Sequence, residues 1–224
     1  MENACESEEG IPVFTEKKGG KAVGTELEIK FAVDDLQKLD CMLCDTMIRE
    51  KMQENNYRFL KMDTTYFDTE SGALSANKWM LRIRKENDQS FVTMKTPGEG
   101  YARGEWNVQA DYLEDAVPLL VKDGAPKELT ALLGDGLLPI CGVQFTRILG
   151  RLAFSDGTAC DLCGDIGQFT GGGKTAPLCE LELELTDGQA QTMLDFARAL
   201  QTKYGLAEQK KPKLVRAREL IQQR

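Results

Sequence analysis

The chain has 224 residues, of which 42% are hydrophobic and 29% are charged, a balance typical of a globular protein. Its formal net charge of −8 argues against a general nucleic-acid binder, which normally presents a basic face. The absence of histidine excludes Ser-His-Asp triads, Cys-His dyads and histidine-ligated metals. Any hydrolytic chemistry must therefore use carboxylates, lysine, arginine, tyrosine, cysteine or a metal held by oxygen ligands.

The sequence also indicates where the protein is found. No hydrophobic run reaches the ~18 residues of a membrane span, so no membrane association is expected. The first ten residues, MENACESEEG, are acidic and polar and do not resemble a secretion signal. The seven cysteines, an odd number, are expected to be reduced thiols. We therefore expect a cytoplasmic protein with a polar N-terminal tail over residues 1–24 and a single domain over residues 25–224.

Alternation between hydrophobic and polar residues predicts five strands in the first half of the chain, at residues 24–33, 59–68, 79–85, 90–95 and 103–110. After the first strand, Asp34 is a candidate N-cap, and leucines at helical spacing predict a helix as far as Asn55. Short helices are expected within residues 111–140. The first half therefore alternates strands with inserted helices.

The second half of the chain repeats the strand pattern and ends in helices. Strands are predicted at residues 143–154, 158–169 and 178–185, which brings the total to about eight. A helix is expected from an N-cap at Asp187 to Tyr204, and a last helix over residues 212–223. Many short antiparallel strands in one domain favour a barrel or a sandwich.

Charged side chains occupy one face of these strands. Residues two apart in a strand share a face, so Glu180, Glu182 and Glu184 point one way and the leucines between them point the other. The same holds for Glu26, Glu28 and Lys30, for Arg82 and Arg84, and for Arg147 and Arg151.

These faces could simply be solvated, which is the usual case for one strand. Two features favour a different interpretation. The charged positions are almost all Glu, Asp, Lys and Arg, and the helices can cover only the apolar face. We therefore predict a mainly β fold with inserted helices (α+β): an eight-stranded, antiparallel, closed β-tunnel, with its charged face inward and its helices packed outside.

A lumen that holds both signs of charge suits a metal–polyphosphate complex. Lysine and arginine bind phosphate oxygens, arginine in a bidentate manner. Carboxylates hold a hard divalent cation, which bridges phosphate oxygens and activates water. Carboxylates alone would indicate a metal store, and cations alone an anion binder.

The motifs on these strands resemble those of the CYTH domain family, the triphosphate tunnel metalloenzymes. TELEIKF is similar to the ExExK signature that opens the family, MLRIRKE to its LRxR strand, and VTMKTPGEG to its TLKTPG segment. RGEWNV, CDLCGDIGQF, LCELELEL and KPKLVRA follow in the family's order, over residues 25–217. Pro212 departs from the pattern, because it replaces the usual serine before Lys213. The KTPG and RGEWN segments and the insertion at residues 111–143 look most like bacterial inorganic triphosphatases.

The resemblance and the residue types together imply metal-dependent hydrolysis of inorganic tripolyphosphate to pyrophosphate and phosphate. The cofactor would be Mg²⁺ or Mn²⁺. The expected metal ligands are Glu26, Glu28, Asp165, Glu182 and Glu184. The expected phosphate contacts are Lys30, Arg82, Arg84, Lys95, Arg103, Arg151, Lys213 and Arg216, with Lys30, Glu28 and Arg82 closest to the chemistry.

Three alternatives remain open at this point: a class IV-type adenylate cyclase, a thiamine triphosphatase, and a non-catalytic module that binds polyphosphate or a nucleotide. Recognition of a base usually needs an aromatic platform beside the phosphates. The parity of Trp79 and Trp106 points both rings to the outer face, and the inward positions are nearly all ionic. We therefore expect tripolyphosphate or another triphosphate as the partner, no nucleic acid, and a monomer or homodimer.

Overall fold

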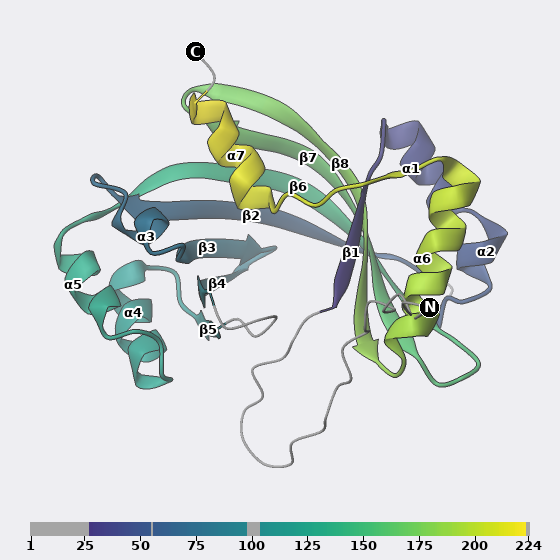
Figure 1. Ribbon diagram of the computed structural model, residues 1–224, viewed down its shortest axis with the longest axis horizontal. Helices are drawn as coiled ribbons and strands as arrows, with labels where there is room; N and C mark the ends of the chain where they lie inside the picture. Colours follow the sequence, from purple (N-terminus) through teal and green to yellow (C-terminus); the bar gives the residue numbers. More distant parts are fainter. Residues whose placement is uncertain (1–26, 55, 98–103, 223–224) are drawn as a thin grey trace, which may run out of the picture.

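The computed structural model describes residues 27–54, 56–97 and 104–222, which form one strongly curved antiparallel sheet with helices around it (Figure 1). The order of the strands in the sheet is β5-β4-β3-β2-β6-β7-β8-β1-β9. Their bounds are β1 Glu28–Ala32, β2 Arg58–Thr69, β3 Met80–Glu86, β4 Gln89–Thr96, β5 Gly104–Gln109, β6 Leu137–Ala153, β7 Ala159–Gly171, β8 Lys174–Asp187 and β9 Ala207–Glu208.

The described residues also form seven helices, six between these strands and one, α7, after the last strand. Their bounds are α1 Leu36–Leu43, α2 Thr46–Arg49, α3 Ala73–Ala76, α4 Leu113–Lys122, α5 Glu128–Gly134, α6 Ala190–Tyr204 and α7 Lys213–Gln222. In this part of the chain, none of them is long and apolar enough to cross a membrane.

The mainly antiparallel fold with inserted helices is confirmed, with two corrections to the sheet. A ninth strand, Ala207–Glu208, pairs with β1. It is too short to give an alternating pattern. In addition, β5 and β9, which stand at opposite ends of the strand order, do not pair with each other in the described segments, so the sheet is open where we predicted a closed one. Alternation within a strand says which face is buried, but closure depends on the twist and stagger accumulated over all the strands.

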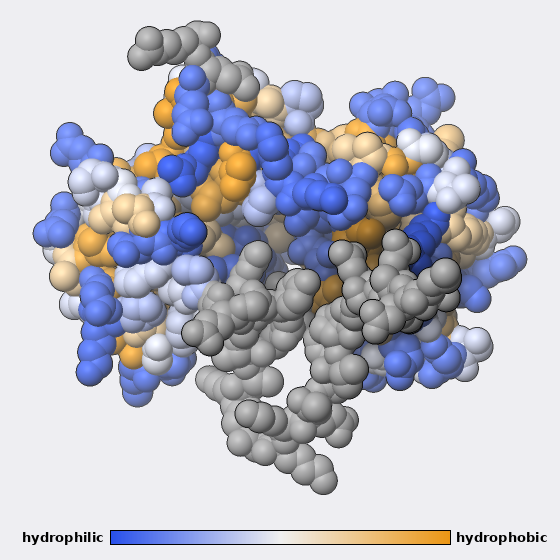
Figure 2. Space-filling view, viewed as in Figure 1, coloured by the Kyte–Doolittle hydropathy of each residue, from blue (hydrophilic) through white to orange (hydrophobic). Residues whose placement is uncertain are grey.

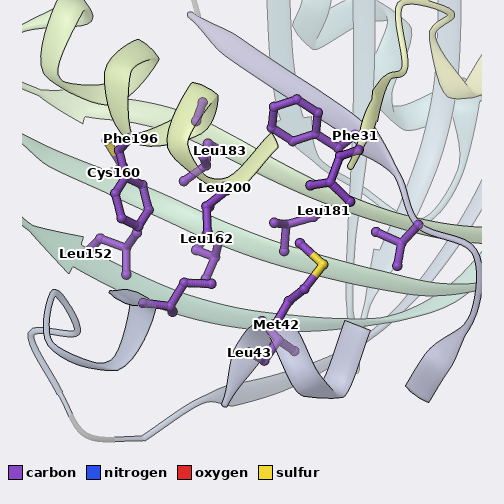
Figure 3. Packing of buried hydrophobic residues seen from close by; sticks show 14 of the residues in the cluster. Phe31, Met42, Leu43, Leu152, Cys160, Leu162, Leu181, Leu183, Phe196 and Leu200 are labelled. Carbon is purple, nitrogen blue, oxygen red and sulfur yellow. The ribbon is translucent and has the colours of Figure 1, made fainter. Parts of the chain in front are cut away.

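The convex face of the sheet at β1, β8, β7 and β6 is covered by α1, α2 and α6. Phe196 and Leu200 of α6 pack with Leu183 and Leu162 of the sheet, and Met42 of α1 joins them on the same face (Figure 3). Leu162, Leu183, Leu200 and Met42 are fully buried. Their cluster is the largest part of the hydrophobic core among the described residues.

A second hydrophobic cluster covers the same face at the other end of the sheet. There, Leu81, Val92 and Met94 of β3 and β4 pack against Val117 and Leu120 of α4. The rings of Trp79 and Trp106 belong to this cluster, as their parity predicts.

The last helix, α7, lies on the concave, charged face, which corrects the prediction that all helices pack outside. Leu214, Ala217 and Leu220 of α7, three residues apart on one helix face, pack against aromatic and aliphatic side chains of β2, β6, β7 and β8. Those sheet residues are Met62, Tyr66, Phe145, Phe169 and Leu178, at the same parity as the charged residues farther along each strand. Strands buried on both faces lose their alternation, and here α7 buries the second face.

The predicted helix over residues 34–55 divides into α1 and α2, because two aspartates each begin a helix. The Asp35 carboxylate accepts a hydrogen bond from the Lys38 backbone N–H at 2.8 Å, so Asp35, rather than Asp34, is the N-cap of α1. Asp45 accepts from Met47 N–H at 2.8 Å and begins α2. Similarly, α6 begins after Gln189 rather than at Asp187.

Candidate functional site

Cross-strand pairing brings the charged residues of the central strands into rows on the concave face. Arg147 of β6 lies opposite Asp165 of β7, which lies opposite Glu180 of β8. Two residues along the strands, Glu182 of β8 lies opposite Lys30 of β1. Because register partners share a face of the sheet, strand pairing alone places these five side chains side by side.

Three buried carboxylates form the centre of the site. One oxygen each of Asp165, Glu180 and Glu182 lies within 4.8 Å of the others, and the three residues are at most 6% exposed. Cations surround them. The Arg147 guanidinium donates to Asp165 through two nitrogens, at 2.8 and 2.7 Å, and reaches Glu182 at 2.5 Å.

The first turn of α7 supplies the remaining cations. The Lys213 ammonium lies 2.9 Å from Asp165 and 2.6 Å from Glu182, and also contacts Glu180. Arg216 donates to Glu180. The site therefore opposes three carboxylates to three cations, and α7 is held on the sheet by charges as well as by hydrophobic packing.

The charges shift one another's ionisation. Burial pushes the pKa of Glu182 upward, but the nearby charges of Lys213 and Arg147 outweigh it and lower this pKa to about 2. Burial raises the pKa of Glu180, and the charge of Glu182 adds to the rise. Burial alone would lower the pKa of Lys213, yet Asp165, Glu182 and Glu180 together raise it above the usual lysine range. At neutral pH Lys213 is therefore fully charged.

The β3 side of the concave face carries two arginines. Arg82 and Arg84 share this face, and the Nε atoms of both are buried without a hydrogen-bond partner among the described residues. Burial lowers the pKa of Arg84, and the neighbouring charge of Arg82 lowers it further. Arg82 lies opposite Tyr66 of β2, and burial raises the pKa of the Tyr66 hydroxyl. Crowded guanidinium groups with unused donors are suited to an anion.

At the more open end of the face, Glu28 lies opposite Glu184, and the Lys30 ammonium contacts Glu28 at 3.1 Å. Within the described segments, Glu28 and Glu184 do not belong to the group of converging carboxylates. Arg151 also stands at this end, where it donates to Asp161 at 2.9 Å and is 52% exposed.

The remaining predicted site residues lie outside this central group. Lys95 is on β4, on the same face as Arg82, and contacts Glu105 at 2.7 Å. Glu26 and Arg103 fall outside the described residues.

Two residues of the central cluster, Arg147 and Glu180, were not among the predicted site residues. The signal was present in the sequence, because Arg147 shares a face with Arg151, and Glu180 shares a face with Glu182. The inward positions are also less ionic than predicted. Tyr66, Phe145 and Phe169 point to the concave face, where α7 buries them, and Phe91 of β4 lies there half-buried opposite Arg84.

The carboxylate group fits a hard divalent cation. Mg²⁺ and Mn²⁺ prefer oxygen ligands, and three carboxylate oxygens converge here from two neighbouring strands. In Figure 2, hydrophilic side chains lie across the upper middle of the molecule, and hydrophobic side chains gather beside α7.

Comparison with known proteins gives the family. The CYTH domain model matches residues 24–217. An inorganic triphosphatase from Haemophilus influenzae is 27% identical over 179 residues, which cover 78% of this chain and 49% of the relative. The chain thus spans about half the length of that curated relative.

Solved structures share the fold. A candidate adenylyl cyclase from Hippeastrum with a dominant triphosphatase activity has a TM-score of 0.55 and 16% identity, covering 87% of this chain and 95% of that one. A candidate adenylate cyclase from Bacillus halodurans has a TM-score of 0.53 and 18% identity, covering 85% and 96%. Because the family model spans most of the sequence and these folds agree, the protein belongs to the CYTH domain family.

Proposed function

We propose that this protein hydrolyses a triphosphate chain with the help of Mg²⁺ or Mn²⁺, and that inorganic tripolyphosphate is its preferred substrate. One observation carries the proposal: a single concave face holds both converging carboxylates and paired arginines. The carboxylates lie on β7 and β8, and the arginines lie on β3, which β2 and β6 separate from β7. Carboxylates can hold a metal ion, and guanidinium groups with unused donors can hold phosphate oxygens. The Haemophilus influenzae relative, an inorganic triphosphatase, supports the same class of reaction.

Each group on the face has a proposed role. Asp165, Glu180 and Glu182 would hold the metal. Glu28 and Glu184, which face each other at the more open end of the concave face, could hold a second ion. A bound Mg²⁺ or Mn²⁺ would polarise phosphoryl oxygens and activate water. Arg82, Arg84, Lys30, Lys213 and Arg216 would clamp the phosphates and neutralise the charge that develops on the transferred group and on the pyrophosphate leaving group.

The substrate preference follows from which aromatic rings can reach a ligand. Trp79 and Trp106 pack in the outer core, and α7 buries Tyr66 and Phe169 on the inner face. Among the described residues, Phe91 is the inner-face aromatic ring that remains partly exposed. The face therefore offers many charges to phosphate and little stacking surface to a base or a thiamine ring.

A substrate panel tests the proposal. We expect phosphate release from tripolyphosphate with Mg²⁺ or Mn²⁺, none after chelation with EDTA, and no cyclic AMP from ATP. We also expect kcat/KM for tripolyphosphate to exceed the values for ATP and thiamine triphosphate. If either of those substrates is preferred by more than about tenfold, the organic group is being recognised and the assignment is wrong. If Phe91→Ala then loses that preference, Phe91 is the residue that contacts the organic group. Tight binding without turnover would identify a binding module instead.

Two variants connect the activity to the site. Glu182→Gln should abolish turnover while the protein stays folded, because a metal ligand is lost with little change in shape. Arg82→Met should lower kcat/KM by about 10²–10³, since it removes a charge aimed at the phosphates. Asp195→Asn is the matched control, because Asp195 pairs with Arg198 on α6, away from the concave face. Near-normal activity in Glu182→Gln, with metal still required, would place the metal elsewhere.

A further inference from the structure

The Lys213 ammonium occupies the space in which a metal ion would bind. Its nitrogen contacts all three carboxylates of the central group, Asp165, Glu180 and Glu182. Those are the same three carboxylates whose oxygens converge within 4.8 Å. A divalent cation at this point would meet a positive charge at contact distance. Ammonium and metal therefore compete for one set of ligands.

Lys213 is well suited to move without disturbing the fold. It is the first residue of α7, and its side chain is 15% exposed. The helix is anchored by Leu214, Ala217 and Leu220, so a change in the lysine side chain does not require the helix to leave. Lysine also carries a point charge on a flexible four-carbon stem, whereas Arg147 is fixed by its bidentate contact with Asp165.

A triphosphate offers Lys213 a second partner. Phosphate oxygens on the concave face would bind the ammonium as well as the carboxylates do, and would leave the carboxylates free for metal. The Arg216 guanidinium, which donates to Glu180, could likewise bind phosphate oxygens instead of this carboxylate. With both bound, Lys213 would keep an anionic partner and the three carboxylates a cationic one, whereas a metal bound alone would face the charge of Lys213.

We propose that Lys213 exchanges partners between the carboxylates and the substrate, so that metal binding and phosphate binding assist each other through this side chain. The inference rests on the proposed function, because it uses the same metal and the same anion. Coupling of this kind is reciprocal: an anion that draws Lys213 away must raise the affinity for metal by the factor by which metal raises the affinity for the anion.

The exchange is tested by measuring the affinity for Mn²⁺ in the absence of any phosphate. Calorimetry and the electron paramagnetic resonance of free Mn²⁺ both give this affinity. In Lys213→Met, which removes the competing charge, we expect Mn²⁺ to bind about tenfold more tightly than in the wild type. Lys211→Met is the control, since Lys211 is an exposed neighbour that pairs with Glu219. If Lys213 merely orders the carboxylates, its loss would weaken Mn²⁺ binding, and that result would overturn the proposal.

A second measurement uses the wild type, in case Lys213→Met does not fold. Sulfate mimics a phosphoryl group and chelates Mn²⁺ poorly in solution. We expect sulfate to tighten Mn²⁺ binding several-fold in the wild type and, where the variant folds, to have no such effect in Lys213→Met. If sulfate leaves the Mn²⁺ affinity of the wild type unchanged, the exchange is refuted. That failure is distinct from failure of the proposed function, which would appear as no phosphate release from tripolyphosphate.

Discussion

Two arginine–aspartate pairs on the same two strands allow the effect of burial to be measured almost in isolation. Arg147 with Asp165 and Arg151 with Asp161 both join β6 to β7, four residues apart, and both use two guanidinium nitrogens. They differ in environment. The side chains of Arg147 and Asp165 are 19% and 0% exposed, whereas those of Arg151 and Asp161 are 52% and 22% exposed. We predict that Arg147→Met and Arg151→Met will differ sharply in stability.

The magnitude follows from what each substitution leaves behind. Removal of Arg147 strips Asp165 of both guanidinium contacts and Glu182 of one, and an uncompensated buried charge costs about 3–5 kcal/mol. Lys213 still contacts Asp165, so we expect the lower end, about 3 kcal/mol. Removal of Arg151 breaks an exposed pair, which contributes about 0–1 kcal/mol.

Urea denaturation followed by circular dichroism measures both differences. For a domain of this size, 3 kcal/mol corresponds to a fall in Tm of about 6–12 °C. The effect of Arg151→Met should shrink further in 1 M salt, whereas that of Arg147→Met should change little, because buried pairs are poorly screened. In the double variant Arg147→Met/Asp165→Asn, part of the lost stability should return. The reasoning fails if the two single variants lose equal stability, or if the double variant is as unstable as the sum of its parts.

Two further predictions concern positions away from the carboxylate group. Hydrogen bonds from Lys203 and Tyr204 lower the pKa of Asp45 to about 2, below its unfolded value of 3.8, so its contribution to stability is present above pH ~4 and is lost as the pH falls toward 2. The difference in unfolding free energy between the wild type and Asp45→Asn should therefore be constant near neutral pH and shrink below pH ~4; a difference that stays constant to pH 2 would contradict this. A methyl group on Gly171 would lie 2.6 Å from the carbonyl oxygen of Ala217 in α7, so Gly171→Ala should destabilise the protein by about 1–3 kcal/mol and weaken phosphate binding. Gly134→Ala, which meets nothing within 4 Å, should be neutral or stabilising by up to about 1 kcal/mol, and equal losses in both variants would refute the argument for α7.

The sequence by itself determined the strands and which way their charges point. Glu180, Glu182 and Glu184 alternate with leucines, and a two-residue period leaves one choice once the leucines are buried. In the same way, parity alone placed Trp79 and Trp106 in the outer core. These features are local, because each depends on neighbours within a few residues.

The tertiary structure alone decided how the charges pair. Asp165 and Glu182 were predicted as metal ligands together with Glu28 and Glu184, yet they converge with Glu180, because register between strands, not spacing within one, sets which oxygens meet. Nor did the sequence show that α7 would lie on the concave face. Its hydrophobic residues could have covered either side of the sheet. The apolar patch around Phe145 and Phe169, which several strands assemble, gives them a complementary surface beside the carboxylates that bind Lys213.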